Sequence, residues 1–274
     1  MKIDWEGIAN YLAVPGTNNP LFYLGDSFQS KDGAFKFAIH GHVVDFIGEA
    51  SGEKGGATSQ LEYWESSEPG LRLSSHSVQV QFAEQRLEYL SRFISFDDVQ
   101  SALDIGCGNG VGTVSLSHRV NIVFGLDMSG YLLNQMPDNI VGVRGDASRL
   151  PLRDKAVDFS MAWELIHHIE EPAAVLLEIR RVTRKWIVLF EPNRWNPLQA
   201  GFSLAVSEER LGLRNTRTYL VNLMGKAGLK VVHYTTVGCI FPNKSPIWLA
   251  RLLGKVPFKI PYLGISHLLI AEVG

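Results

Sequence analysis

Cysteine is scarce in this sequence, which has Cys107 and Cys239 as its two cysteines in 274 residues. Two distant cysteines cannot form a disulfide framework or a four-cysteine zinc site, so we expect no bound metal and a reducing, cytoplasmic compartment. A strong net charge is also lacking, because 26 Lys and Arg are opposed by 28 Asp and Glu. The resulting net charge of minus 2 is not typical of a protein dedicated to nucleic-acid binding.

Long hydrophobic runs are missing as well. No segment approaches the roughly 20 apolar residues that span a bilayer. The first ten residues include Asp4 and Glu6 and lack the apolar core of a signal peptide. Hydrophobic residues nevertheless make up 46% of the chain and charged residues 20%. This composition excludes general disorder and predicts a soluble, folded protein of one large domain or two unequal ones.

The charge is distributed unevenly along the chain. Residues 1–100 hold 7 basic and 14 acidic side chains, whereas residues 180–274 hold 14 basic and 4 acidic ones. Within the basic part, residues 239–263 combine four cations with large apolar side chains and contain no acidic residue. Such a segment is typical either of an insertion that packs on the core or of one that lies on an anionic membrane. Peripheral contact with the inner face of the membrane therefore stays open as an alternative.

Residues 1–60 are predicted to form a small β-rich N-terminal domain. Within residues 34–47, apolar and polar side chains alternate in two runs, one on each side of His40 and Gly41, which indicates a hairpin. We expect His40 and His42 to face solvent there rather than to bind a metal. The Gly- and Ser-rich stretch at 51–60 is typical of a linker, and it would lead into a second domain at 61–274.

From Ser101 onward, short apolar runs alternate with helical stretches. Strands are predicted at 102–105, 122–126, 140–143, 157–162, 186–190, 230–234 and 266–271. Helices are predicted at 77–93, 112–117, 172–181 and 218–227. We place Glu84, Arg86 and Glu88 on the solvent-facing side of the first of these helices. The alternation predicts an α/β fold with a doubly wound, seven-stranded, mainly parallel sheet that binds ligands at the C-terminal ends of its strands.

A glycine-rich turn follows the first of these strands. The glycines stand at every second position after Asp104, namely at Gly106, Gly108 and Gly110. Glycine at such positions lets the backbone approach a ligand closely and adopt positive φ. A dinucleotide fingerprint would have its third glycine at position 111, which is Val111, so hydride transfer is disfavoured. The order of Asp and glycines instead resembles motif I of the class I S-adenosylmethionine-dependent methyltransferases.

The resemblance covers about residues 77–274 and implies a Rossmann-like methyltransferase fold, an antiparallel final strand and S-adenosylmethionine as cofactor. Asp127 ends the second strand, about 20 residues after the turn, where a carboxylate can accept both hydroxyls of a ribose. Asp146 ends the third strand, and in the family the matching carboxylate accepts from the adenine amino group. The amide that matches Ala147 bonds the adenine ring, and Met128 is assigned to the same site.

The segment after the fourth strand supplies the candidate catalytic residues. Trp163 is assigned to the methionine end of the cofactor site, where the family more often has a small or amide residue. The titratable residues expected beside the methyl group are Glu164, His167, His168 and Glu191. A hydroxyl or amine acceptor would need one of them as a base, whereas a carbon nucleophile would need none. We favour His167 or Glu164 as this base and expect His168 to be structural.

The sequence therefore predicts a methyltransferase that acts on a small-molecule or lipid-like acceptor, with residues 193–215 as an insertion that covers the substrate. One alternative is an RNA methyltransferase that uses the basic C-terminal region. Residues 1–50 faintly resemble zinc-ribbon modules of such enzymes, without their cysteines. Nucleic acid is disfavoured because residues 163–166 lack an Asn-Pro-Pro-Tyr-like sequence. A non-enzymatic binding protein on the same scaffold is the second alternative, and the intact cofactor acids argue against it.

Overall fold

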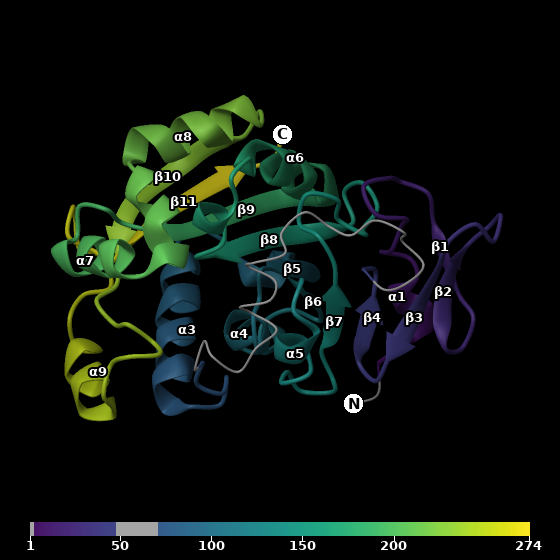
Figure 1. Ribbon diagram of the computed structural model, residues 1–274, viewed down its shortest axis with the longest axis horizontal. Helices are drawn as coiled ribbons and strands as arrows, with labels where there is room; N and C mark the ends of the chain where they lie inside the picture. The colour runs from purple at the N-terminus through teal and green to yellow at the C-terminus, as the bar shows by residue number, and fades with distance from the viewer. Residues whose placement is uncertain (1–2, 48–70) are drawn as a thin grey trace.

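The structure of the chain, a computed structural model, describes residues 3–47 and 71–274. Its framework is one sheet, to which eleven strands of the described residues contribute. Seven of them follow the spatial order β7-β6-β5-β8-β9-β11-β10 and form the α/β unit (Figure 1). Their bounds are β5 Ser101–Ile105, β6 Ile122–Asp127, β7 Val141–Arg144, β8 Val157–Trp163, β9 Thr183–Pro192, β10 Lys230–Val237 and β11 Ser266–Glu272.

Each of the seven predicted strands is confirmed, although β9 and β10 extend beyond their predicted ends. The strands β7, β6, β5, β8 and β9 run parallel, and β11 lies antiparallel between β9 and β10, as expected for the final strand. The chain enters this unit at β5 and then builds outward, first toward β6 and later toward β8. Such a reversal of strand order opens a crevice at the C-terminal ends of the strands, where ligands of doubly wound folds bind.

Helices cover both faces of the sheet, so the doubly wound architecture is confirmed (Figure 1). One face carries α6 (Pro172–Val182) and α8 (Arg217–Lys226). The other face carries α3 (Ser77–Leu90), α4 (Val111–Ser117) and α5 (Gly130–Leu133). Remaining helical segments are α1 Trp5–Ile8, α7 Pro197–Ala205, α9 Ile247–Leu253 and the 3-10 helices η2 Phe96–Asp98, η3 Ile166–His168 and η4 Ser207–Arg214. Among the described residues, no helix combines the length and apolarity needed to cross a membrane.

The N-terminal strands continue the same sheet. They are β1 Leu21–Tyr23, β2 Ser27–Ser30, β3 Lys36–His40 and β4 Val43–Asp45, and β3 with β4 forms the predicted hairpin. β4 runs parallel to β7, with Val44 beside Val143, and the Arg144 guanidinium donates to Asp45 at 3.1 Å. Buried residues of both parts share one hydrophobic cluster. The predicted boundary between residues 60 and 61 lies outside the described residues, so the division into two domains stays a prediction.

Two surface predictions are wrong. Arg86 is 1% exposed, because it follows Phe82 by four residues and precedes Leu90 by four, and helical spacing places all three on the buried face of α3. His42 is also buried, and its Nε2 lies 3.1 Å from the carbonyl oxygen of Leu133. The helical spacing of Arg86 was a local signal for its burial, whereas the burial of His42 depends on neighbours that are distant in sequence.

Candidate functional site

The glycine turn after β5 has the geometry that its sequence predicts. Gly106, Gly108 and Gly110 have φ values of 69°, 55° and 84°, which L side chains rarely adopt. A Cβ added at Gly106 would lie 2.8 Å from Leu165, and one at Gly110 would lie 2.7 Å from Met136. At Gly108 an added Cβ would meet no atom of residues 3–47 or 71–274 within 4 Å. The turn therefore presents its backbone to open space at Gly108.

The carboxylate of Asp127 joins this turn to the next strand end. It accepts the backbone N–H of Gly108 at 2.8 Å and that of Ser129 at 2.9 Å. The sequence predicted the position of Asp127 but not that it would also hold the glycine turn in place.

The third strand end lies next in the sheet. Asp146 follows β7, and its carboxylate accepts the backbone N–H of Ser148 at 2.8 Å, while Ala147 is buried beside it. The carbonyl oxygen of Met128 accepts from Arg144 Nε at 3.2 Å. The pairing of β5 with β6 and of β6 with β7 thus brings the predicted cofactor residues together at one edge of the sheet.

Asp104 on β5 stabilises this edge of the sheet from within the protein. Its side chain is buried, and its Oδ2 accepts the hydroxyl of Thr113 on α4 at 2.7 Å. Burial raises the pKa of Asp104 to about 7, the hydrogen bond from Thr113 opposes this rise, and the negative charge of Asp127 adds to it. The hydrogen bond from Thr113 thus links Asp104, which precedes the glycine turn, to α4. The Asp104 side chain is itself shielded from solvent.

Trp163 closes the end of β8. Its ring packs edge-on against Phe82 and Phe190, at centroid distances of 6.0 and 5.6 Å. Its indole N–H is buried and has no hydrogen-bond partner among the described residues. The Arg86 guanidinium lies 3.3 Å above the Phe82 ring and 5.5 Å from that of Trp163, and burial lowers its pKa to about 9. A buried donor without a partner at a strand end is typical of a site that a ligand completes.

Glu164 stands directly after this strand, in a conformation that is unusual for glutamate. Its φ is 55°, and strained backbone of this kind is concentrated at functional sites. Its Oε1 accepts the Ser266 hydroxyl at 2.7 Å. Burial raises the pKa of Glu164 to about 7, despite the opposing positive charges of His167 and Arg86. A carboxyl group with a pKa near neutrality is suited to exchange a proton with an acceptor.

His167 does not fit the predicted role of base. Its ring is fully buried, with Nδ1 3.0 Å from Glu191 and Nε2 3.1 Å from Glu209. Burial lowers the pKa of His167, but the two carboxylates outweigh this effect and raise it to about 10. A ring that already carries its proton, and has both nitrogens engaged, cannot accept another from a substrate.

Glu191 organises the turn that contains these residues. Its two carboxylate oxygens accept the backbone N–H groups of Leu165, Ile166 and His167 at 2.8 to 3.2 Å, together with Nδ2 of Asn215 at 3.2 Å. The carboxylate of Glu191 therefore serves to hold the segment after β8. Of the predicted catalytic bases, Glu164 is the one that remains available to accept a proton from a substrate.

Several contributing residues were missed by sequence reasoning, namely Arg86, Thr113, Glu209, Asn215 and Ser266. Arg86 carried a usable signal, because its helical spacing matches the apolar residues of α3. Glu209, Asn215 and Ser266 lie far from the motifs in sequence, and no local feature marks the contact that Thr113 makes with Asp104. A cavity of about 680 Å³ is lined by α1 and the start of β6 and lies away from these strand ends, so it is not the site described here.

Comparisons with known proteins agree with this geometry. Residues 103–188 match the family model described as a methyltransferase domain. A protein of transposon TN4556 from Streptomyces fradiae is 34% identical over 110 residues, which cover 36% of this chain and 32% of that protein. A ubiquinone biosynthesis O-methyltransferase from Nitrosomonas europaea is 26% identical over 149 residues, covering 49% of this chain and 62% of that enzyme. The chain thus matches between about a third and three fifths of the length of these relatives.

The fold also resembles solved structures. A protein from Thermotoga maritima, described as an SAM-dependent methyltransferase and a possible histamine N-methyltransferase, superposes with a TM-score of 0.54. The match covers 72% of this chain and 91% of that one at 17% sequence identity. At this identity the likeness establishes the fold and leaves the acceptor undefined.

Proposed function

We propose that this chain, which carries a class I S-adenosylmethionine-dependent methyltransferase domain, transfers a methyl group from that cofactor to a small-molecule or lipid-like acceptor. The observation that carries the proposal is the open space at Gly108, bordered by acidic residues at the next two strand ends. When bound, the cofactor supplies a methyl group on a sulfonium, which needs a well-placed nucleophile more than covalent help.

The residues present fit this cofactor. Asp127 would accept the ribose hydroxyls at the end of β6. Asp146 and the backbone amide of Ala147 would bind the adenine, and Trp163 would offer its unpartnered indole N–H at the methionine end. Each group lies on a different strand end of the same sheet edge.

Glu164 would act as the general base toward a hydroxyl acceptor. Its carboxylate takes the proton of the acceptor oxygen, and the Ser266 hydroxyl holds the carboxylate in position through its 2.7 Å hydrogen bond. The buried guanidinium of Arg86 lies nearby and favours negative charge in this region. The similarity to an enzyme described as an O-methyltransferase supports an oxygen nucleophile.

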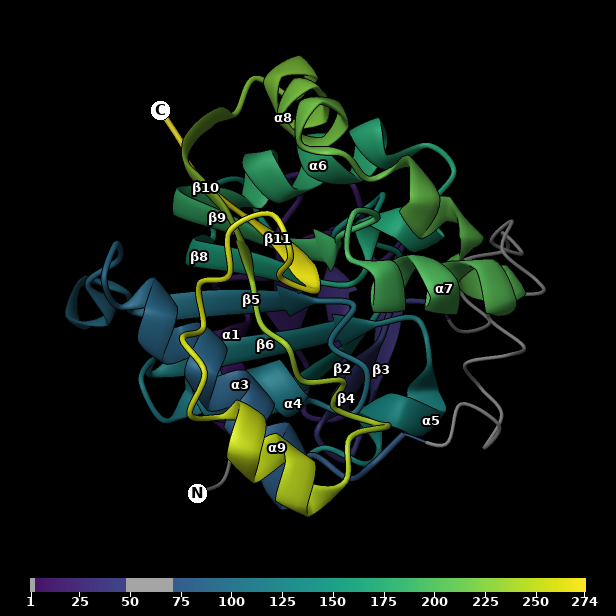
Figure 2. The same ribbon diagram turned by 90° about the vertical axis from the view of Figure 1, so that its left-hand side faces the viewer.

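A lipid-like acceptor is supported by exposed apolar side chains on α7 and α9. These helices follow the C-terminal ends of β9 and β10, and Figure 2 shows them on the side of the molecule that faces the viewer. We call this surface the apolar end, and its exposed members are Trp195, Leu198, Leu204, Ile247, Trp248, Leu252, Val256, Tyr262 and Leu263. The exposed cations Lys244, Arg251, Lys255 and Lys259 accompany them. We infer that this surface rests on an anionic membrane and receives the acceptor from it.

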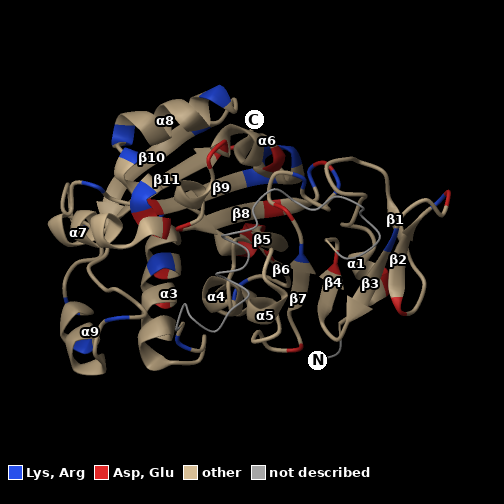
Figure 3. Ribbon diagram, in the orientation of Figure 1, with Lys and Arg blue, Asp and Glu red and all other residues tan. Residues whose placement is uncertain are grey.

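An RNA acceptor is less well supported. The basic residues of the C-terminal part are spread over α6, β9, η4, α8, β10 and α9, and α8 and α9 lie at opposite ends of that half of the molecule (Figure 3). An RNA footprint would favour a continuous basic face.

The test combines cofactor binding with turnover. We expect the purified chain to bind S-adenosylhomocysteine, and Asp127→Ala to weaken that binding about 100-fold, since two hydrogen bonds of roughly 1.5 kcal/mol each are lost. Labelled cofactor is then offered with phenols, with the same phenols carrying prenyl chains, and with RNA. Methylation of the phenols supports the proposal, whereas labelled RNA alone, or binding without turnover to any acceptor, would contradict it.

A further inference from the structure

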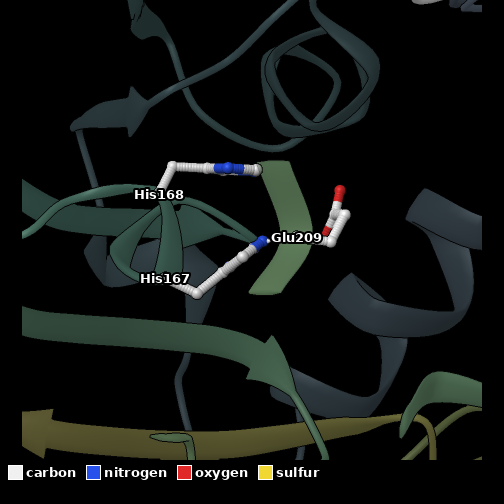
Figure 4. Close-up of side chains that lie close together, drawn as sticks. All are labelled: His167, His168 and Glu209. Carbon is white, nitrogen blue, oxygen red and sulfur yellow. Dashed lines mark hydrogen bonds and ion pairs between the residues drawn. The ribbon is translucent and has the colours of Figure 1, made fainter. Parts of the chain in front are cut away.

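Two adjacent histidines and a distant glutamate converge beside the proposed active site. His167 and His168 belong to η3 and Glu209 belongs to η4, and Figure 4 shows both rings extending toward the segment that carries Glu209. One nitrogen of each histidine and one carboxylate oxygen all lie within 4.8 Å of one another. Two imidazole nitrogens and one carboxylate oxygen form a recurrent ligand set for transition metals.

The ring of His167 is held in place on its Nδ1 side, which faces away from Glu209. Its Nδ1 lies 3.0 Å from Glu191, whose carboxylate is itself held by the backbone N–H groups of 165–167. This arrangement sets the orientation of the ring and directs Nε2 toward Glu209, 3.1 Å away. A carboxylate behind a histidine is the usual outer support of a metal ligand, because it fixes the ring and makes the other nitrogen more basic.

Charge balance also favours a divalent ion. Two carboxylates, those of Glu191 and Glu209, contact the buried ring of His167, at 3.0 and 3.1 Å. The charge of a divalent ion with two neutral imidazoles would balance both carboxylates. Nitrogen ligands disfavour calcium and magnesium, which prefer oxygen.

We propose that His167, His168 and Glu209 bind a divalent transition-metal ion of the zinc type, with Glu191 as outer support. The sequence predicted no metal because cysteine is scarce, but this ligand set uses no cysteine. The site goes beyond methyl transfer, since it fastens η4 to η3. Arg214 already links the same two elements, through its guanidinium and the carbonyl oxygens of Ile166 and Ile169. Metal binding would therefore add a second link between η3 and η4, which belongs to the predicted substrate-covering segment 193–215.

The experiment is a titration of the full chain with Zn²⁺ after removal of metals by a chelator. We expect one Zn²⁺ per chain and a rise in the unfolding temperature when it binds. His168→Asn removes one ligand and keeps the contact between His167 and Glu209, so it should weaken Zn²⁺ binding at least tenfold. Glu209→Gln should weaken it as well. The matched controls are His40→Asn in the exposed hairpin turn and Glu208→Gln on the same helix, which should bind Zn²⁺ as the unmodified chain does.

Binding of S-adenosylhomocysteine is measured on the same samples as a check of folding. Retained cofactor binding together with lost Zn²⁺ binding in His168→Asn would establish the site independently of methyl transfer. The proposal is overturned if the unmodified chain binds no Zn²⁺, or if His168→Asn and Glu209→Gln bind it as tightly as their controls.

Discussion

Gly108 is the position at which we propose that the glycine turn contacts the cofactor. Its φ of 55° and the absence of any atom of the described residues within 4 Å of an added Cβ distinguish it from Gly106 and Gly110, where a side chain would collide with the protein itself. A substitution at Gly108 therefore tests ligand binding, whereas one at either neighbour tests the fold.

We expect Gly108→Ala to fold and to lose most of its affinity for S-adenosylhomocysteine, because the new methyl group enters the space of the cofactor. The strain of a positive φ costs about 1 kcal/mol. Gly41→Ala is the control, since Gly41 has a φ of 65° and equally open surroundings in the remote hairpin. Calorimetric titration with S-adenosylhomocysteine measures the affinity of both variants. Equal affinities of Gly108→Ala and Gly41→Ala would show that Gly108 is not part of the cofactor site.

The base that we propose, Glu164, is expected to set the pH dependence of the reaction. A base must be deprotonated to act, and the pKa of Glu164 is raised to about 7, so the rate should fall as the pH drops through about 7 and level off above it. We expect Glu164→Gln to lower kcat by about 100-fold or more and to abolish this pH dependence, with cofactor affinity unchanged. Glu170→Gln, an exposed neighbour, is the control. A pH profile that is the same in Glu164→Gln would assign the base elsewhere.

At the scale of elements, α9 is an amphipathic helix fastened to the core by one side only. The side-chain amides of Gln81 and Gln85 on α3 donate to the carbonyl oxygens of Ala250 and Gly254, at 2.8 and 3.3 Å. Ala250 is buried, while Trp248 is 68% exposed. Both alternatives that the sequence left open for 239–263 thus find support, because the segment packs on α3 and still exposes a large apolar surface.

We expect the chain to sediment with anionic liposomes and not with neutral ones, and salt to reduce this binding. Four cations near an anionic surface contribute on the order of 4 kcal/mol, which apolar insertion of Trp248 would supplement. The combined change Lys255→Glu, Lys259→Glu and Trp248→Ser should abolish sedimentation.

The control carries the same reversal of two charges on α8 and at the start of β10, as Lys226→Glu with Lys230→Glu. It should sediment like the unmodified chain. If neither liposome type retains the unmodified chain at low salt, a soluble acceptor becomes the better proposal.

At the scale of the whole molecule, the N-terminal strands and the α/β unit share a hydrophobic cluster. Leu21 on β1 is buried in the same cluster as Phe124 on β6. Arg153, between β7 and β8, donates to the carbonyl oxygens of Leu12 and Ala9 at 3.2 Å. The two parts should therefore unfold together.

We expect Leu21→Ala to lower the free energy of unfolding by about 2–5 kcal/mol and to shift one common transition, because it leaves a cavity in the shared core. Tryptophan fluorescence and circular dichroism, recorded on the same denaturant series, should give coincident curves. Leu24→Ala on the exposed part of the same hairpin should change little. Two separated transitions would show that the N-terminal part is an independent domain.

The sequence by itself determined the seven strands of the α/β unit, the positions of α3, α4, α6 and α8, and the sheet edge where the glycine turn meets the next two strand ends. Each of these depends on a short contiguous pattern, such as an apolar run or the order Asp104, Gly106, Gly108 and Gly110. Parallel pairing then brings consecutive strand ends together, so Asp127 and Asp146 could be placed without long-range information.

Only the tertiary structure decided which polar residues are buried and which groups they contact. Glu164 meets Ser266 across 102 residues of sequence, and His167 meets Glu191 and Glu209 across 24 and 42 residues. These contacts favour Glu164 over His167 among the two predicted bases, because two carboxylates raise the pKa of His167 to about 10, whereas burial raises that of Glu164 to about 7. The protonation state of a side chain depends on its three-dimensional surroundings, and a local sequence pattern carries no record of them.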